Sequence, residues 1–186
     1  MIAPNQKKNS ILVFDTNIFL TGIDFNFFKE TIVSTPAIIN EIKVKKYKDQ
    51  NRNILQRIEL AIELEKLIIK NPTEYYIKLV EEKSKITGDI NALSKTDVEL
   101  IALALELMST ADNEIVLYTN DYSIENLCSE LNLKFKALFK NGIKSKIYFE
   151  VFCPYCKTIY KPEDLNANCE RCGLKLKRRL LKKEKI

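Results

Sequence analysis

The 186-residue chain contains no histidine, only four glycines and five prolines, and no unbroken run of 18 or more apolar residues. The missing histidine excludes catalysis by an imidazole base. The low glycine and proline content, with 46% hydrophobic and 30% charged residues, indicates a folded globular chain rather than extended disorder. No membrane-spanning helix is expected, and the opening MIAPNQKKNS lacks the apolar centre of a secretory signal. We therefore expect a cytoplasmic protein with no membrane partner.

Cysteine is also scarce, but four of the five cysteines form two Cys-x-x-Cys pairs within CPYCKTIYKPEDLNANCERCG, residues 153–173. In a reducing compartment, such pairs are more typical of metal ligands than of disulfides. The spacing predicts one tetrahedral structural zinc ion, held by Cys153, Cys156, Cys169 and Cys172. Gly173 matches the turn that follows a pair of this kind. The fifth cysteine, Cys128, lies in IENLCSEL, where a small buried residue fits a helix, so we expect it in the core.

Positive charge is unevenly spread along the chain. Residues 142–186 carry 12 Lys and Arg against 5 Asp and Glu, whereas residues 1–141 carry 18 against 20. Residues 142–186 keep an excess of positive charge after the charges of four thiolates and one zinc ion are included. It indicates a polyanionic partner, although KLKRRLLKKEKI taken alone also fits a tail that only increases solubility.

The hydrophobic pattern alternates between short strands and helices. We expect strands at 11–14, 31–34, 114–118 and 133–138, and helices at 36–44, 53–70, 73–86, 94–108 and 121–131. Thr35 and Pro36 are typical of a helix N-cap and first helical position. This alternation predicts an α/β fold with a parallel central sheet and helices on both faces. IKSKIYFEVF, beginning at residue 143, is a hairpin-like or linking stretch, and a domain boundary is expected near 140–150.

Acidic residues follow the strands at the edge where open parallel sheets place their sites. Asp15 comes directly after strand 11–14, Asp121 closely follows strand 114–118, and Glu41 lies on the helix after strand 31–34. Asp97, at the start of the helix TDVELIALALEL, can join them. Four carboxylates in one cleft repel one another unless cations lie between them, and an all-oxygen ligand set suits Mg²⁺ or Mn²⁺.

Each acid has an alternative explanation. Asp97 could cap its helix, since both SKTD and TDVE fit a capping box. Asp121 could be a turn residue, and Glu41 could lie on a solvated face. Asp15 is harder to explain in this way. It directly follows a buried strand, and Thr16 and Asn17 can hold its oxygens by hydrogen bonds, which is a costly arrangement unless something binds there.

The motifs FDTN after the first strand, a Glu on the second helix, KTDVELIALALEL and the T-x-D of YTND resemble the PIN-domain ribonucleases. A PIN domain followed by a four-cysteine zinc ribbon and a basic tail resembles the NIN-one-binding (Nob) endonucleases of ribosome biogenesis in their short archaeal form. The resemblance implies a three-layer PIN fold and cleavage of precursor small-subunit ribosomal RNA at its mature 3′ end, within the small-subunit precursor. It implies that Asp15, Glu41, Asp97 and Asp121 bind Mg²⁺ or Mn²⁺, assisted by Thr16, Asn17 and Thr119. Asn120 stands where the family often has an acid.

These inferences divide the chain into a PIN-like nuclease domain (1–143), a linker (144–150), a zinc ribbon (151–177) and a basic tail (178–186). A closed four-thiolate site has no open position for chemistry, so the ribbon is a scaffold that offers side chains to RNA. The predicted RNA-binding residues are Arg171, Lys175, Lys177, Arg178 and Arg179, beside the exposed aromatic or apolar side chains of Tyr155, Ile159 and Tyr160.

Two alternatives remain open at this point, and a third is disfavoured. A PIN-type toxin ribonuclease would cut a different RNA, although most such proteins lack a zinc ribbon. A non-catalytic RNA-binding assembly factor would keep the fold and the ribbon without metal chemistry. A haloacid-dehalogenase-like phosphatase also has an Asp after its first strand, but it requires an acid at position 17, where this chain has Asn.

Overall fold

The computed structural model describes residues 10–44, 52–110, 112–138 and 142–185. The stretch at 1–9, on which the secretory-signal expectation depends, lies outside the described residues, as does Ile186 of the predicted tail. Within the described part of the chain, no helix combines the length and the apolar character needed to cross a bilayer.

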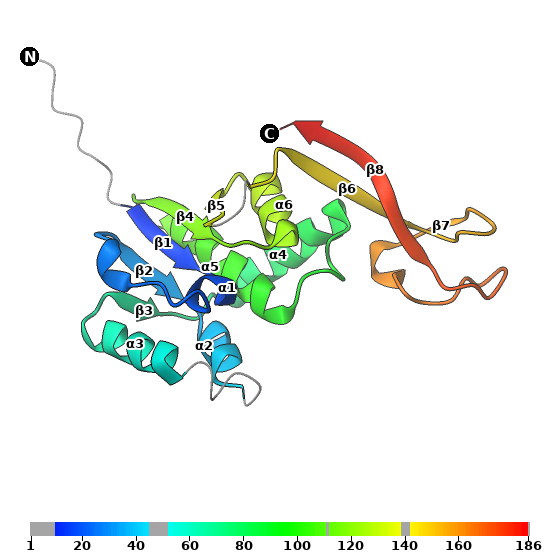
Figure 1. The fold of residues 1–186 in the computed structure, drawn as a ribbon. Helices are drawn as coiled ribbons and strands as arrows, with labels where there is room; N and C mark the ends of the chain where they lie inside the picture. Colours follow the sequence, from blue (N-terminus) through cyan, green and yellow to red (C-terminus); the bar gives the residue numbers. More distant parts are fainter. Residues whose placement is uncertain (1–9, 45–51, 111, 139–141, 186) are drawn as a thin grey trace, which may run out of the picture.

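A five-stranded sheet with the order β3-β2-β1-β4-β5 forms the centre of the N-terminal domain, residues 10–138 (Figure 1). Its strands are β1 (Ser10–Phe14), β2 (Thr31–Ser34), β3 (Leu67–Ile69), β4 (Glu114–Tyr118) and β5 (Lys134–Lys136). All four neighbouring pairs are parallel. The predicted parallel α/β sheet is therefore confirmed.

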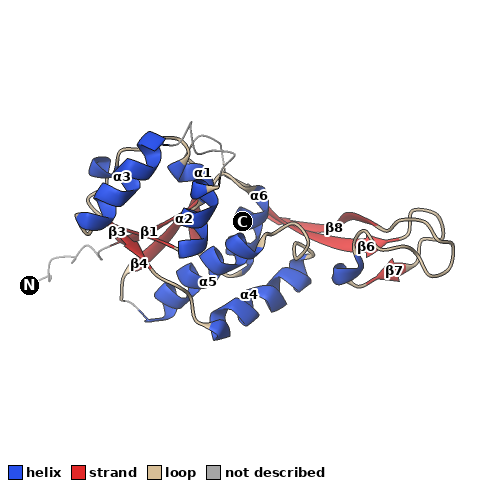
Figure 2. Ribbon diagram, turned by 90° about the horizontal axis from the view of Figure 1, so that it is seen from below, coloured by secondary structure: helices blue, strands red, loops and turns tan. Residues whose placement is uncertain are grey.

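Helices lie on opposite sides of this sheet, with α3 on one side and α4 and α5 on the other (Figure 2). The helices are α1 (Thr16–Phe19), α2 (Pro36–Lys43), α3 (Arg52–Glu63), α4 (Glu74–Thr87), α5 (Lys95–Thr110) and α6 (Tyr122–Glu130), with a 3₁₀ turn, η1, at Phe25–Phe27. The predicted start of α2 is confirmed, since Thr35 Oγ1 accepts a hydrogen bond from the Ile38 amide and Pro36 is the first helical residue. Cys128 is fully buried on α6, as expected.

The long helix predicted at 53–70 is wrong in its second half. Helix α3 ends at Glu63, and Leu67–Ile69 forms the edge strand β3. Glu65 has a φ of 55°, and the Lys66 amide bonds back to the Ala61 carbonyl, which closes the helix. The apolar residues here fit both the helical and the strand periodicity. Pairing of residues 67–69 with β2 decides in favour of a strand.

The carboxyl ends of β1 and β4 form the point where the chain direction across the sheet reverses. From β1 the chain continues to β2 and β3 on one side, whereas β4 and β5 lie on the other. Asp15 and Asp121 follow these two strands. The Asp15 amide donates a hydrogen bond to the Tyr118 carbonyl at 3.1 Å, so the two strand ends are locked together. In open α/β sheets this reversal point is where ligands bind.

A second, antiparallel sheet forms the C-terminal module, residues 145–185, which extends away from the N-terminal domain (Figure 1). It contains β6 (Ser145–Phe152), β7 (Ile159–Tyr160), β8 (Lys177–Lys185) and the 3₁₀ turn η3 (Pro162–Asp164). The stretch predicted as a linker, 144–150, and the stretch predicted as a tail, 178–186, differ from this, because their described residues lie mainly in β6 and β8. The two strands pair from Ser145 with Lys185 to Phe152 with Lys177. Residues 145–152 form one strand of a sheet, paired with β7 and β8, and so differ from the predicted linking stretch.

The module is attached to the N-terminal domain by contacts at more than one point. Glu130 of α6 accepts a hydrogen bond from the Tyr148 hydroxyl at 2.8 Å and forms an ion pair with Lys146 at 2.9 Å. Farther out, Asn91 Nδ2 donates to the Pro162 carbonyl at 2.6 Å. The position of the module relative to the sheet is therefore set by specific contacts.

Candidate metal and nucleic-acid site

Asp15 is the most deeply buried of the four predicted acids, with 4% of its surface exposed. Its position as N-cap of α1 points the carboxylate back over the strand ends, and Oδ1 accepts from the Thr16 amide at 2.6 Å. Burial is the largest cause that raises the pKa of Asp15 to about 6, and the charges of Asp97 and Asp121 act in the same direction. The carboxylate is thus buried near other negative charges.

Two threonines connect Asp15 to its neighbours. Thr16 Oγ1 donates to Glu41 Oε2 at 2.6 Å, so Thr16 contacts both Asp15 and Glu41. Thr119, fully buried, donates to Asp15 Oδ2 at 2.7 Å and accepts from the Asp121 amide at 3.0 Å. These contacts bring three of the four predicted acids together.

Asn17 strengthens the same arrangement. Its Nδ2 donates to Asp15 Oδ2, and its Oδ1 accepts from the Asn120 amide at 3.2 Å. Thr16, Asn17 and Thr119, predicted as cofactor-binding residues, therefore orient the carboxylates. Asn120, at the position where an auxiliary acid was in question, has an amide side chain whose Oδ1 accepts from the Leu138 amide at 3.1 Å.

Asp97 combines a local structural role with proximity to the other acids. Its Oδ2 accepts from the Ser94 amide at 2.7 Å, and Ser94 Oγ accepts from the Asp97 amide at 3.2 Å, so the SKTD capping box is present. Burial, followed by the charges of Asp121 and Glu41, raises the pKa of Asp97. Capping leaves the other carboxylate oxygen available to a cation.

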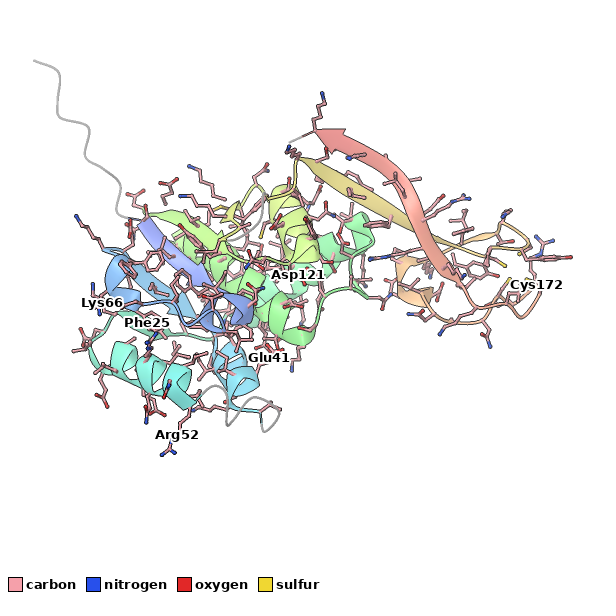
Figure 3. The ribbon with its side chains drawn as sticks, viewed as in Figure 1. Phe25, Glu41, Arg52, Lys66, Asp121 and Cys172 are labelled. Carbon is pink, nitrogen blue, oxygen red and sulfur yellow. The ribbon has the colours of Figure 1, made fainter. Side chains whose placement is uncertain are left out.

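Glu41 and Asp121 form the exposed side of the cluster. Figure 3 shows Glu41 on α2 and Asp121 at the start of α6, with Cys172 far out on the C-terminal module. Asp121 Oδ1 accepts from the Ser123 amide at 2.7 Å, which makes it the N-cap of α6. The four acids, all within the described ranges, therefore lie close enough for their charges to interact, but no three of them bring ligand oxygens within 4.8 Å of one another. Their role as metal ligands stays a prediction.

The cysteines form a separate and tighter cluster. Among the described residues, they are the one group of potential metal ligands whose atoms all lie within 4.8 Å of one another. The Cys153–Cys172 and Cys156–Cys169 sulfur distances are 3.3 and 3.5 Å. Sulfurs bound tetrahedrally at about 2.3 Å from zinc would lie about 3.8 Å apart. All are free thiols, so the geometry fits a zinc site.

The two Cys-x-x-Cys loops have the same backbone shape. The amide of the residue after each pair, Lys157 or Gly173, donates to the carbonyl of the first cysteine, at 3.0 and 2.8 Å. Both residues have positive φ angles, 61° and 73°. The turn predicted at Gly173 is confirmed, and the first loop achieves it with a lysine. The Tyr160 hydroxyl contacts Cys169 Sγ at 3.1 Å and lowers the pKa of that thiol to about 6, which favours the thiolate that zinc requires.

The predicted RNA-binding side chains are not equivalent. Arg171, Lys175 and Lys177 are exposed on the C-terminal module. Arg179 pairs with Glu150 at 2.7 Å and stacks on the Phe152 ring, whereas Arg178 stacks on Phe149 and faces Asp89. Of the apolar and aromatic residues beside them, Tyr155 is 75% exposed and Ile159 is 52% exposed. Tyr160 instead contacts the cysteine cluster.

Sequence reasoning missed a group at the junction between domain and module. Gly88 and Asn126 contact β6, and Asp89 bonds to Asn126 and faces Arg178 of β8. Asp89 and Asn126 are buried. Gly88 is recognisable in the sequence as a helix C-terminal glycine, and it has a φ of 77°. The burial of Asp89 has no sequence signal, because its partners are distant in the chain.

A family model described as the PIN domain of ribonuclease matches residues 12–107, a range that includes Asp15, Glu41 and Asp97 but ends before Asp121. The chain is 31% identical over 172 residues to "Endoribonuclease Nob1" of Methanocaldococcus jannaschii, covering 92% of this chain and 79% of that protein. It is 30% identical over 166 residues to "Endoribonuclease Nob1" of Pyrococcus abyssi, covering 89% and 91%. It is also 31% identical over 176 residues to "Ribonuclease VapC1" of Thermoplasma acidophilum, covering 95% and 81%. Given the matched domain, the parallel sheet and identity over nearly the whole chain, this protein belongs to the PIN-domain ribonucleases and, within them, to the Nob1 endoribonuclease family.

Proposed function

We propose that this protein is a divalent-metal-dependent endoribonuclease that cleaves precursor small-subunit ribosomal RNA at its mature 3′ end. The observation that carries the proposal is the buried carboxylate of Asp15 at the reversal point of the sheet, with three further acids around it. Negative charges that are buried close to one another destabilise the folded state unless a cation lies between them. The relatives named as Nob1 endoribonucleases support the same activity.

The residues of the cluster fit Mg²⁺ or Mn²⁺. Asp15, Glu41, Asp97 and Asp121 offer carboxylate oxygens, the donors that these hard ions prefer. When bound, such an ion supplies an acidified attacking water and neutralises charge that develops on the phosphate oxygens. Thr16 and Thr119 hold the carboxylates in orientation, and Ser94 fixes Asp97 at the start of its helix. With no histidine in the chain, no imidazole base competes for this role. The products would carry a 5′-phosphate and a 3′-hydroxyl.

The cysteine cluster fits one structural Zn²⁺. Four thiolates leave no open position for chemistry, so we assign the ion to folding of the C-terminal module as a zinc ribbon. Among the described residues, the module's buried hydrophobic cluster consists of Val151, Cys153, Cys169 and Leu176, and so small a core gains stability from such an ion.

The charge distribution supports RNA as the partner. A group of acids repels a phosphate backbone, and the basic module would supply the attraction. The small-subunit precursor, with its precursor rRNA, is the proposed target, because this assignment follows from the Nob family resemblance of the acids, the cysteine pairs and the basic C-terminal segment together.

The test is incubation of the zinc-loaded protein with an RNA that spans the 3′ end of the small-subunit precursor, with Mg²⁺, with Mn²⁺ or with neither. We expect a single cut that requires one of the two ions. The matched control is the same RNA with the junction sequence scrambled. Metal-dependent cutting of both RNAs with equal efficiency would favour a toxin-like ribonuclease of different specificity, and RNA binding without cutting would favour a non-catalytic assembly factor.

A further inference from the structure

A small cavity lies at the junction between the acid cluster and the C-terminal module. It has a volume of about 160 Å³. Its walls include Tyr122 and Ser123 at the start of α6, Asp89 from the α4–α5 connection, and Phe149 and Arg178 from β6 and β8. The cavity is thus built from both parts of the protein.

The cavity is next to the proposed catalytic acids. Ser123 donates its amide hydrogen to Asp121 Oδ1 at 2.7 Å, so one wall is two residues from that acid. The charge of Asp121 also acts on Asp89. A group bound in the cavity would therefore lie close to RNA bound at the acid cluster.

Asp89 supplies a buried acceptor in this cavity. It is 1% exposed, and its Oδ2 accepts from Asn126 Nδ2 at 2.6 Å. Its Oδ1 lies 3.8 Å from Arg178 Nη1, beyond hydrogen-bond distance. Thr87 is a second side-chain hydrogen-bond partner of Asp89. A carboxylate has about four acceptor sites, so the contacts with Asn126 and Thr87 still leave capacity for another donor.

Arg178 supplies donors beside this acceptor. Its guanidinium carbon lies 4.5 Å from the centre of the Phe149 ring, so the side chain is held flat against β6. A buried carboxylate beside a stacked guanidinium is complementary to the edge of a nucleobase, which carries N–H donors next to nitrogen or carbonyl acceptors. Proteins read unpaired RNA bases by such edge contacts and by stacking on aromatic rings or guanidinium planes.

We propose that this cavity holds the base of one unpaired nucleotide of the RNA, a short distance along the strand from the phosphate that is cut. This inference rests on the proposed nuclease function and extends it by naming a substrate contact. The base donates to Asp89 and accepts from Arg178, and its insertion sets the register of the strand against the acid cluster. The size of the cavity agrees with a single base, which is smaller than a drug-sized ligand. Its volume of about 160 Å³ is correspondingly below the roughly 300–1,000 Å³ of pockets for drug-sized ligands.

The experiment measures binding of the full zinc-loaded chain to precursor RNAs that each lack one base, without Mg²⁺ or Mn²⁺ so that no cutting occurs. We expect one abasic position near the cut site to weaken binding roughly tenfold, the scale of one lost base contact. Arg178→Lys should abolish most of this position-specific penalty. Arg179→Lys is the matched control, because Arg179 also stacks on a phenylalanine but does not line the cavity, and it should keep the penalty.

A second variant protects the test against misfolding. Ser145 lines the cavity, and the larger side chain in Ser145→Met would fill part of it while the charges of Asp89 and Arg178 are kept. It should also abolish the penalty, with zinc content and circular dichroism unchanged. If no abasic position stands out in the wild type, or if Arg178→Lys and Ser145→Met keep the penalty, the cavity is not a base site. Because binding is measured without cutting, failure of the proposed nuclease activity would be seen separately, in the cleavage assay.

Discussion

At the scale of single residues, the candidate site depends on how Asp15 is held. A carboxylate that is 4% exposed is rarely found beside other acids. Here the Thr119 hydroxyl, the Thr16 backbone amide and the Asn17 side-chain amide hold it in that position. Its neighbours Thr16 and Thr119 each contact a second acid of the cluster. The arrangement therefore keeps several negative charges in place, as cation binding requires and as folding alone would not favour.

Replacing Asp15 by Asn tests this charge. The change retains the shape and most hydrogen bonds but removes one negative charge, so cleavage in Mg²⁺ or Mn²⁺ should fall by at least about 100-fold. RNA affinity should stay equal or rise, because the acid group then carries one negative charge fewer and repels phosphate less. Single-turnover cleavage and metal-free binding assays measure the two effects. A variant that cuts at the wild-type rate would remove Asp15 from the mechanism.

The raised pKa of Asp15 predicts how stability depends on pH in protein free of Mg²⁺ and Mn²⁺. The folded-state pKa of about 6 lies above the ordinary value of 3.8, so the folded state binds more protons between these values. The protonation of Asp15 therefore contributes stability that is fully present below about pH 4 and is lost as the pH rises through about 6. The loss in the free energy of unfolding is up to about 3 kcal/mol. Urea unfolding of wild type and Asp15→Asn should show a variant advantage that is larger at pH 7 than at pH 5. An equal advantage at both pH values would contradict the shift.

At the scale of elements, the close contact between the α4–α5 connection and β6 determines where the module lies. A methyl group on Gly88 would come within 2.5 Å of the Phe149 carbonyl oxygen, so the backbones touch directly. Asn126 adds hydrogen bonds to both the amide and the carbonyl of Ile147, each 2.7 Å long. The C-terminal module is therefore joined to the N-terminal domain as a sheet edge against a helix end.

Gly88→Ala should destabilise the protein more than Gly22→Ala. Both glycines have positive φ angles, 77° and 71°, but Gly22 has no neighbouring atom within 4 Å of an added methyl group. The Gly22 change should cost about 1 kcal/mol from backbone strain alone. The Gly88 change should cost roughly 1–3 kcal/mol more from the steric clash. Chemical denaturation of both variants measures the difference, and equal losses would show that the junction yields without cost.

The cysteine loops predict one equivalent of zinc per chain. Cys169→Ser should abolish zinc binding and unfold the C-terminal module, since Cys169 is buried in its small core. The five-stranded sheet has its own larger core and should remain folded. Metal analysis and two-dimensional NMR measure both effects. Wild-type protein with reduced cysteines and no zinc would contradict the assignment.

At the scale of the whole molecule, the exposed positive charge and the proposed catalytic acids lie in different parts of the protein. The acids are gathered at the carboxyl ends of β1 and β4, whereas exposed cations are concentrated on the projecting C-terminal module. Such a division would let the module attract RNA while the acids at the sheet edge stay available for the proposed cation. It also means that affinity and cleavage can be altered separately by substitution.

Replacing Arg171, Lys175 and Lys177 by Gln should flatten the salt dependence of RNA binding. Each lost phosphate contact to a single strand lowers the log–log slope by about 0.7, so the triple change should lower it by about 2. The control removes three exposed lysines of the N-terminal domain, Lys29, Lys78 and Lys136, by the same substitution. Titrations at several salt concentrations measure the slope. If both triple variants lower it equally, the module has no special part in binding.

The sequence by itself determined the features that depend on local spacing. Strands such as 31–34 and 114–118, the N-cap at Thr35 and the turn at Gly173 are each specified by neighbouring residues, and each agrees with the structure. The order of strands and acids along the chain was likewise sufficient to predict that Asp15 and Asp121 lie at one edge of a parallel sheet.

Where the local sequence fits more than one secondary structure, only the tertiary structure decided which one is adopted. Residues 67–69 continue a helical pattern but become β3 because β2 offers an edge, and residues 177–185 become β8 because β6 lies alongside. Arg178 faces Asp89, 89 positions earlier in the chain, and Asn126 joins Asp89 to β6. These choices depend on hydrogen bonds and burial between segments that are distant in sequence, and local propensity contains no information about such partners.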